Sequence, residues 1–360
     1  MKTFACKTKI YTGSGSLAGL REMGIRRLLL VTDPYFLENG TAQRLVDLSG
    51  AAETEVFHKI KPDPDVHLAA EGTAVLRAFA PDVLVALGGG STIDCAKAMI
   101  WFSEKEIPLV AVPTTSGSGS EVTNFAVLTH EGVKHPLVDE KLCPKAAILD
   151  SDLLTALPPG LIADTGFDLI SHGLEALVAA DATSFTDALA TEAVVTAMTL
   201  LRRSYSGDVT VRGELHQAST MAGMAFAQAG LGLCHAMAHG LGGAFHLPHG
   251  RLNAILLPWV IRHNAPACAA KYAKLARRAG LSGAADGVAV RNLCNALTGL
   301  RRELRLPRDL REAGIAPSQV AACADKLIRD ILNDPCCEKN PAPVTAEAVK
   351  SILFQVAGHG

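Results

Sequence analysis

The first 150 residues alternate short apolar runs with stretches of helical period. Strands are expected at 9–12, 27–32, 55–60, 83–87, 109–112 and 146–149, and patterns such as 15–23, 65–79 and 91–102 predict helices between them. Alternation at this spacing is typical of βαβ units and a mostly parallel sheet. The run VLVALGGG is apolar throughout, as expected of a central strand covered on both faces.

The pattern changes after Asp150. Ala- and Leu-rich segments of helical period follow, at 162–179, 187–201, 212–227, 264–278, 287–304 and 344–356. Pro158, Pro159 and Gly160 mark the boundary. We therefore expect an α/β domain with a Rossmann-like parallel sheet at residues 1–157 and an all-helical domain at 158–360. A site is expected in the cleft between two such domains.

Composition narrows the class of protein. A chain of 360 residues is long enough for two domains, and its net charge of −2 gives no overall attraction for nucleic acid or an anionic membrane. The nine cysteines are scattered without a C-x-x-C pair, which is typical of reduced thiols, and the adjacent Cys336 and Cys337 are interpreted as bystanders. No secretory signal is expected, because MKTFACKTKIYTG lacks an apolar core of roughly 7–15 residues, and no apolar run approaches about 20 residues. A cytoplasmic protein is expected.

Two loops rich in glycine and hydroxyl groups follow expected strands. Gly88-Gly89-Gly90-Ser91 leads directly into a helix, and residues 113–120, PTTSGSGS, follow the strand at 109–112. Glycines admit a phosphate close to the backbone, and a helix N-terminus supplies N–H donors. The usual G-x-G-x-x-G fingerprint is absent, and a glycine-rich turn also serves simply as a tight corner. Two such loops at strand ends favour a nucleotide site.

Asp33 ends the strand at 27–32. A carboxylate at this place typically accepts hydrogen bonds from the adenosine ribose and repels a 2′-phosphate, which favours NAD over NADP. The alternative is a carboxylate that caps the following turn at Pro34.

Four of the twelve histidines lie within residues 235–249, which contain no charged side chain: His235, His239, His246 and His249. Single core histidines are usually satisfied by backbone carbonyls, but four in one apolar segment favour a site. Spacing alone leaves open which of the four bind a metal. On one straight helix residues 235 and 249 would be about 21 Å apart, so Gly242, Gly243 and Pro248 are expected to break the helix.

Asp168 and His172 stand one helical turn apart in the apolar segment IADTGFDLISHGLEALV, and so share a face. Imidazoles with one carboxylate and no thiolate suit Zn²⁺ or Fe²⁺ and are poor ligands for Ca²⁺ or Mg²⁺.

These motifs, in order along nearly the whole chain, resemble the iron-containing (group III) alcohol dehydrogenases. The resemblance rests on GGGSTIDCAKA, PTTSGSGSEVT, KHPLVD, TGFDLISHGLEALV and GLGLCHAMAHGLGGAFHLPHG. The last is close to the family signature G-x-x-H-x-x-A-H-x-x-G followed by P-H-G. KTKIYTGSGSLA, TSFTDALA and ASTMAGMAFAQAGLGL most resemble the 1-propanol dehydrogenases of propanediol-utilisation microcompartments. The implied architecture is that shared with dehydroquinate synthase.

The resemblance also assigns residues. It implies Asp168, His172, His235 and His249 as metal ligands and His239 as a proton-relay residue beside the nicotinamide, and it leaves His246 with a structural role. It implies NAD contacts at Asp33, Gly89, Gly90, Ser91, Asp94, Thr114, Thr115, Ser118, Thr123 and Lys134. Asp63 departs from the family's Asn in a Pro-Asn-Pro turn: it still accepts from a ribose, but it donates no amide hydrogen bond.

The implied enzyme is an NAD(H)-dependent, Fe²⁺-dependent alcohol dehydrogenase, with Zn²⁺ as the alternative ion, that interconverts a small primary alcohol and its aldehyde. Propionaldehyde reduction to 1-propanol with regeneration of NAD⁺ is the specific expectation. A glycerol or diol dehydrogenase and a broad-range butanol dehydrogenase are alternatives. A dehydroquinate-synthase-like lyase is a remote one, because Arg251 is the only cation near the ligands in sequence. A homodimer is expected, in the cytoplasm or inside a microcompartment with its enzymes or shell proteins, without nucleic acid or membrane partners.

Overall fold

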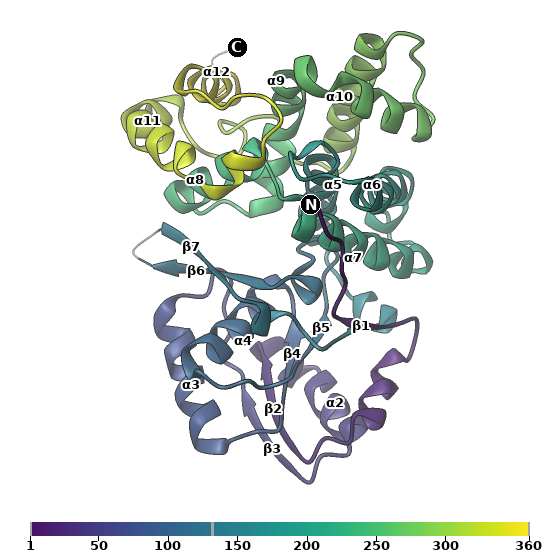
Figure 1. Ribbon diagram of the computed structural model, residues 1–360, viewed down its shortest axis with the longest axis vertical. Coiled ribbons are helices and arrows are strands. Elements are labelled where there is room, and N and C mark those ends of the chain that lie inside the picture. The colour runs from purple at the N-terminus through teal and green to yellow at the C-terminus, as the bar shows by residue number, and fades with distance from the viewer. Residues whose placement is uncertain (1, 131–132, 359–360) are drawn as a thin grey trace. The chain divides into compact units, whose positions relative to one another are not determined.

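The computed structural model describes residues 2–130 and 133–358 (Figure 1). They divide into two compact units. The α/β unit contains residues 5–157, with that gap, together with 212–223, and the helical unit contains residues 2–4, 158–211 and 224–358. Residues 212–223 thus group with the α/β unit, whereas the division expected from the sequence assigns them to the helical domain. The outer limits of that division, 1 and 360, lie outside the described residues.

One sheet of six parallel strands forms the centre of the α/β unit, as far as the chain is described. Its order is β1-β8-β5-β4-β2-β3. The strands are β1 (Lys9–Thr12), β2 (Arg27–Thr32), β3 (Glu53–Phe57), β4 (Val83–Gly88), β5 (Leu109–Pro113) and β8 (Ala146–Leu149). From β2 the chain goes to the edge strand β3 and then returns to β4 on the other side of β2. The carboxyl ends of β2 and β4 therefore flank the switch point, where open α/β sheets bind ligands.

Helices cover both faces of this sheet. They are η1 (Ser16–Met23), α1 (Pro34–Glu38), α2 (Thr41–Ser49), α3 (Val66–Phe79) and α4 (Gly90–Ser103). Successive side chains of a strand point to opposite faces, so Leu29 and Leu84 pack with α3 and α4, whereas Leu30 and Val85 pack with η1 and α2. All four side chains are fully buried, which stabilises the fold by roughly 1.5–3 kcal/mol each. This double coverage explains the uninterrupted apolar strands.

The structure confirms the expected fold class, with two differences in detail. The third strand, expected at 55–60, lies at Glu53–Phe57, in register with β2. A two-stranded antiparallel sheet of β6 (Phe125–His130) and β7 (Val133–Val138) was not expected. Pro136 lies inside β7, and a proline argues against a strand unless it is at a sheet edge, as here.

The helical unit is built from long helices (Figure 1). They are α5 (Pro159–Val178), α6 (Ser184–Tyr205), the end of α7 (Arg212–Ala229), α8 (Leu233–Phe245), α9 (His249–Arg278), α10 (Asp286–Glu303), α11 (Pro317–Leu332) and α12 (Ala346–Val356). None of the helices in the described residues is both long and apolar enough to cross a membrane.

The expected helix break lies at residues 246–248. His246 closes α8 with φ of 55°, in the left-handed region, and its N–H donates to the carbonyl of Gly242 at 2.9 Å. Pro248 then precedes His249, the first residue of α9. His246 thus has a structural place in the chain, and His249 begins a separate helix.

Candidate metal centre and nucleotide-binding loops

Helix α5 carries Asp168 and His172 one turn apart, on one face. Both side chains are buried, because almost every residue of this helix from Ile162 onward is covered. The ring of His172 stacks on Phe226, with ring centroids 4.3 Å apart, and this contact fixes the plane of the imidazole.

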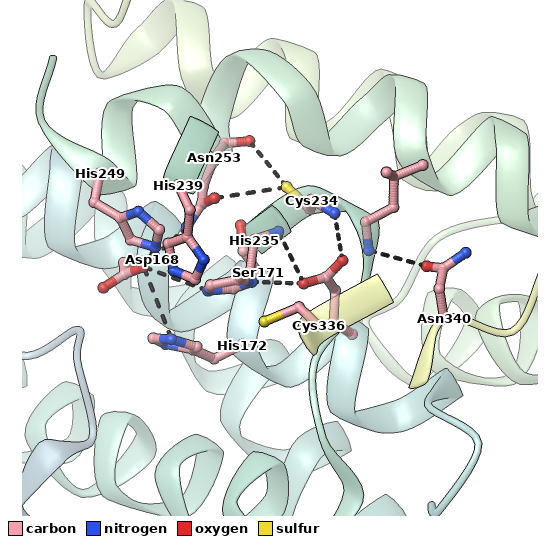
Figure 2. A network of polar contacts seen from close by, with 12 residues as sticks. Asp168, Ser171, His172, Cys234, His235, His239, His249, Asn253, Cys336 and Asn340 are labelled. Atoms are coloured by element: carbon pink, nitrogen blue, oxygen red, sulfur yellow. Dashed lines mark hydrogen bonds and ion pairs between the residues drawn. The ribbon is translucent and has the colours of Figure 1, made fainter. Parts of the chain in front are cut away.

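Three imidazoles converge on Asp168 (Figure 2). The Nε2 atoms of His172, His235 and His249 lie 3.9, 3.8 and 3.5 Å from Asp168 Oδ1. These histidines come from α5, α8 and α9, so three helices supply the cluster. Ligand atoms 2.0–2.1 Å from a tetrahedral ion are about 3.4 Å apart, close to the observed separations. The structure therefore brings Asp168, His235 and His249 into one tight group, with His172 beside Asp168.

His235 gives an independent test of whether an ion fits. Its Nε2 is buried and has no hydrogen-bond partner among the described residues. A buried polar atom without a partner is costly, and a cation that accepts its lone pair would satisfy it. Burial also lowers the pKa of His235 to about 4, and a neutral imidazole is the form that binds a metal. The donor set of three imidazoles and one carboxylate suits Fe²⁺ or Zn²⁺.

Glu175, one turn beyond His172 on α5, orients His235 from behind. Its carboxylate accepts from His235 Nδ1 at 2.5 Å and from the backbone N–H of Cys234 at 2.7 Å. When Glu175 is ionised its carboxylate only accepts, and Nδ1 of His235 then carries the proton while Nε2 keeps its lone pair. Burial raises the pKa of Glu175 to about 7, against the backbone N–H donors at the start of α8.

Asn253 has the corresponding place behind Asp168. Its Nδ2 donates to Asp168 Oδ1 at 2.9 Å, and the side chain is fully buried in α9. Partners of this kind fix the orientation of ligands in metal sites.

His239 lies in a second group of side chains that carry possible metal-ligand atoms, together with Asp334 and Cys336. Its Nδ1 is 2.8 Å from Asp334 Oδ2, and Asp334 Oδ1 accepts from the backbone N–H of Cys336 at 2.9 Å. Burial opposes ionisation of Asp334, but the hydrogen bond and charge of His239 hold its pKa below the usual value. The ring of His239 stacks on that of His249, with centroids 5.3 Å apart. Cys336 lies beside the site (Figure 2), so its interpretation as a bystander does not fit its position.

In the α/β unit the two glycine-rich loops pack against each other. Gly89 caps the N-terminus of α4, with Ser91 in its first turn, and no side chain caps that end. A Cβ on Gly90 would lie 2.8 Å from the Cβ of Ser118, and one on Gly89 would lie 3.2 Å from Oγ1 of Thr115. The N–H of Thr114 donates to the carbonyl of Gly88 at 3.1 Å. The loops thus meet because glycine leaves room there, at the adjacent ends of β4 and β5.

Two of the residues expected to contact the cofactor, Asp94 and Thr123, form hydrogen bonds within the protein. Asp94 accepts from Ser120 Oγ at 2.5 Å and from the N–H of Val127 at 3.0 Å. Thr123 is buried, and its carbonyl and hydroxyl oxygens accept from the buried Nζ of Lys97 at 2.8 and 2.9 Å. These contacts fix the second loop to α4. A contact of either residue with NAD stays a prediction.

Asp33, Asp63 and Lys134 lie outside the loop pair. Asp33 caps α1 by accepting from the N–H of Tyr35 at 3.0 Å, and partial burial raises its pKa. Capping was the alternative considered from the sequence, while its ribose contact remains untested. Asp63 has φ of 53° and accepts from Lys134 Nζ at 3.2 Å, so the residue that departs from the family pattern is paired with another expected cofactor residue.

Sequence reasoning missed Glu175, Asn253, Asp334 and Lys97. Glu175 carried a signal, because a glutamate inside the apolar segment SHGLEALV needs a partner. Asp334 did not, since it lies 95 residues beyond His239 in a short polar segment.

Comparison with known proteins gives the family. A family model described as iron-containing alcohol dehydrogenase matches residues 7–151, and the C-terminal model of the Fe-containing alcohol dehydrogenase family matches residues 162–357. The 1-propanol dehydrogenase PduQ of Salmonella typhimurium (strain LT2) is 40% identical over 99% of this chain and 100% of its own length.

Solved structures agree. An iron-containing alcohol dehydrogenase from Thermococcus thioreducens has a TM-score of 0.91 and 32% identity, covering 99% of this chain and all of that one. A sulfoacetaldehyde reductase from Bifidobacterium kashiwanohense, solved in complex with NAD⁺, has a TM-score of 0.90 and 27% identity over the whole of both chains. The family expected from the sequence motifs is therefore confirmed: the chain belongs to the iron-containing alcohol dehydrogenases and is an enzyme of that type.

Proposed function

We propose that the enzyme uses NAD(H) and a divalent metal ion to interconvert a small primary alcohol and its aldehyde, with reduction of propionaldehyde to 1-propanol as its main reaction. The observation that carries the proposal is the convergence of three imidazoles on Asp168, with the buried Nε2 of His235 lacking a hydrogen-bond partner in the described chain. The choice of 1-propanol is supported by the 40% identity to an enzyme of that name.

Asp168, His172, His235 and His249 would hold the ion, Fe²⁺ or alternatively Zn²⁺. When bound, such an ion supplies Lewis acidity, which lowers the pKa of an alcohol hydroxyl and polarises an aldehyde carbonyl. The protein contributes the ligand orientation, through Glu175 behind His235 and Asn253 behind Asp168.

The loops of the α/β unit would hold NAD. Gly89 and the first turn of α4 offer backbone N–H groups to a pyrophosphate, as at other helix N-termini. Asp33 follows β2, beside the switch point, where a carboxylate favours NAD over NADP. The structural relative solved in complex with NAD⁺ supports this cofactor.

His239 would carry the proton released on alcohol oxidation. Asp334 accepts from Nδ1, which leaves Nε2 as the exchanging atom. The side chain of His239 is 21% exposed, so it has a route to solvent that the 1% exposed His235 lacks. Arg251, the cation nearest to the ligands in sequence, is bound by Asp164 at 3.0 Å, an arrangement that suits an uncharged substrate.

The test is a panel of C2–C4 aldehydes, with glycerol and diols in the oxidative direction, on protein reconstituted separately with Fe²⁺ and Zn²⁺. NADH and NADPH are compared in each case. We expect the highest kcat/KM with propionaldehyde and NADH. Highest efficiency with a diol or with butyraldehyde would replace the proposed substrate, and preference for NADPH would refute the proposed role of Asp33.

His249→Ala tests the metal. We expect loss of both the bound ion and turnover, whereas His263→Ala, which changes a half-buried histidine in the middle of α9, should keep both. A His249→Ala protein with full activity and no bound ion would refute the ligand set.

We also propose that the enzyme is a homodimer that works inside a bacterial microcompartment. The support is the resemblance of its sequence to microcompartment 1-propanol dehydrogenases. Light scattering of the purified protein and its recovery with isolated shells test the two parts separately. A monomeric mass, or absence from the shell fraction, would overturn the respective part.

A further inference from the structure

A cavity of about 960 Å³, broadly open to solvent, lies within the helical unit. It is lined by the start of α5, the end of α6, the start of α9, the C-terminal half of α10 and residues 305–313. Among the residues that the structure describes, its lining includes five arginines and one acidic residue, Glu312. The arginines are Arg251, Arg301, Arg302, Arg305 and Arg308.

Two of these cations are paired. Arg251 donates to both carboxylate oxygens of Asp164, at 3.2 and 3.0 Å. Arg308 lies 3.0 Å from Asp309 and 3.6 Å from Glu312. Among residues 2–130 and 133–358, no carboxylate oxygen lies within 4.0 Å of the side-chain nitrogens of the other three arginines. Glu303, their neighbour in sequence, is paired with Arg202.

Arg301 is the most constrained of the three. It is 6% exposed, and the only hydrogen bond of its guanidinium group within the described chain is a long one, 3.4 Å, to the carbonyl of Ala254. Burial lowers its pKa, against the more distant charges of Glu312 and Asp309. Burying a cation without an adjacent anion is unfavourable. The carbonyl end of α10 offsets about half a charge, less than three guanidinium groups carry.

Arg305 adds an independent observation. Its φ is 57°, and the bonds from its N–H to Arg302 and from the N–H of Leu306 to Arg301 form a Schellman motif that ends α10. Glycine usually occupies this left-handed position, because a side chain is strained there. The arginine at this strained position lines the cavity, so its guanidinium group adds to the positive charge there.

We propose that this cavity binds a small organic molecule that carries a diphosphate group. Guanidinium groups bind phosphoryl oxygens bidentately, and three of them here have no carboxylate beside them. A monophosphate carries about −1.5 to −2 at neutral pH, less than three guanidinium charges. The volume is in the upper part of the range of small-molecule sites and exceeds the size of a lone phosphate.

Calorimetric titration of the full-length protein with inorganic pyrophosphate tests the site. The titration is repeated with NADH present, so that a second pyrophosphate site on the glycine-rich loops is recognised by competition. We expect one pyrophosphate per chain that NADH does not displace. The double variant Arg302→Gln/Arg305→Gln should weaken this binding at least tenfold; both side chains are exposed, so the fold should persist.

The matched control is Arg291→Gln/Arg329→Gln, which removes the same charge from exposed positions outside the cavity lining. It should bind pyrophosphate as the unmodified protein does. Absence of NADH-resistant binding, or an equal loss in the control, would overturn the site. Equal affinity for orthophosphate would overturn the diphosphate assignment and identify free phosphate as the ligand.

Discussion

Glu175→Gln is the sharpest test of the metal centre, because it keeps the shape of a buried side chain and removes one acceptor oxygen. In the native site one oxygen accepts from the N–H of Cys234 and the other from His235 Nδ1. A glutamine amide offers a single acceptor, so one of these donors loses its partner. If it is His235, the tautomer with a lone pair on Nε2 is no longer enforced.

The expected magnitude follows from this loss. Removing such an outer partner of a metal-bound histidine typically weakens metal binding by about 10–100-fold, or roughly 1.4–2.7 kcal/mol. Stability of the metal-free protein should change less, because the cost of an unsatisfied donor is opposed by the removal of a buried charge. The measurement is competition for Zn²⁺ against a chromophoric chelator, with unfolding of the metal-free proteins in parallel.

Asp334→Asn is the matched control. It neutralises the carboxylate behind His239, and His239 is not an expected ligand, so the affinity for Zn²⁺ should stay within about twofold of that of the unmodified protein. Turnover should fall, since general acid–base groups contribute about 10²–10⁴-fold to the rate. A Glu175→Gln protein that binds Zn²⁺ as tightly as Asp334→Asn would refute the proposed orientation of His235.

Three further outcomes are expected. Burial lowers the pKa of His216 to about 4, so below pH 6.5 the unfolded chain binds a proton that the native state excludes. Between pH 7 and pH 4.5 the free energy of unfolding in urea should therefore fall by about 2–3 kcal/mol more in the unmodified protein than in His216→Gln. Parallel pH profiles of the two proteins would refute this. Gly250→Ala should lower the free energy of unfolding by about 1–3 kcal/mol or more and abolish metal binding, because the new Cβ would lie 1.9 Å from the carbonyl oxygen of Asp164. Gly287→Ala should change neither, because a Cβ at that position meets no atom within 4 Å. Arg305→Gly should raise Tm by roughly 2–4 °C by relieving the left-handed strain, and Arg305→Lys should not; equal Tm values would show that the strain is absent.

The sequence was most informative where the physical constraint is local. Strand–helix alternation and double-sided burial produce patterns that are read within ten residues, so the parallel sheet and its glycine-rich loops were predicted. The helix break before His249 was also predicted, because Pro248 acts on its own backbone, whereas α8 continues through Gly242 and Gly243 to Phe245. Assigning the four ligands needed the family resemblance, since spacing alone did not distinguish His246 from His249.

Contacts between residues far apart in the sequence could not be predicted from local sequence patterns. The start of α8 is capped by Glu175, which is 59 residues away from Cys234, and not by a preceding serine or aspartate. Four of the cavity's arginines lie within residues 301–308, but Arg251 joins them only through the packing of α9 against α10. Strand β7 was not predicted because it contains Pro136, and the destabilising effect of a proline on a strand depends on whether the strand lies at a sheet edge.

The partners behind the two histidines of α8 fit the different roles that we propose for them. His235 and His239 are one turn apart on the same helix, and each places Nδ1 against a carboxylate. Glu175 is 2% exposed and also binds the backbone at the start of α8, so it fixes His235 in one orientation, as a ligand requires. Asp334 is 15% exposed and lies on a short segment after α11, so His239 keeps access to solvent, as proton transfer requires. Exchanging the two roles would need exchange of the surroundings as well as the histidines, and for this reason the spacing of imidazoles in the sequence does not separate a ligand from a proton carrier.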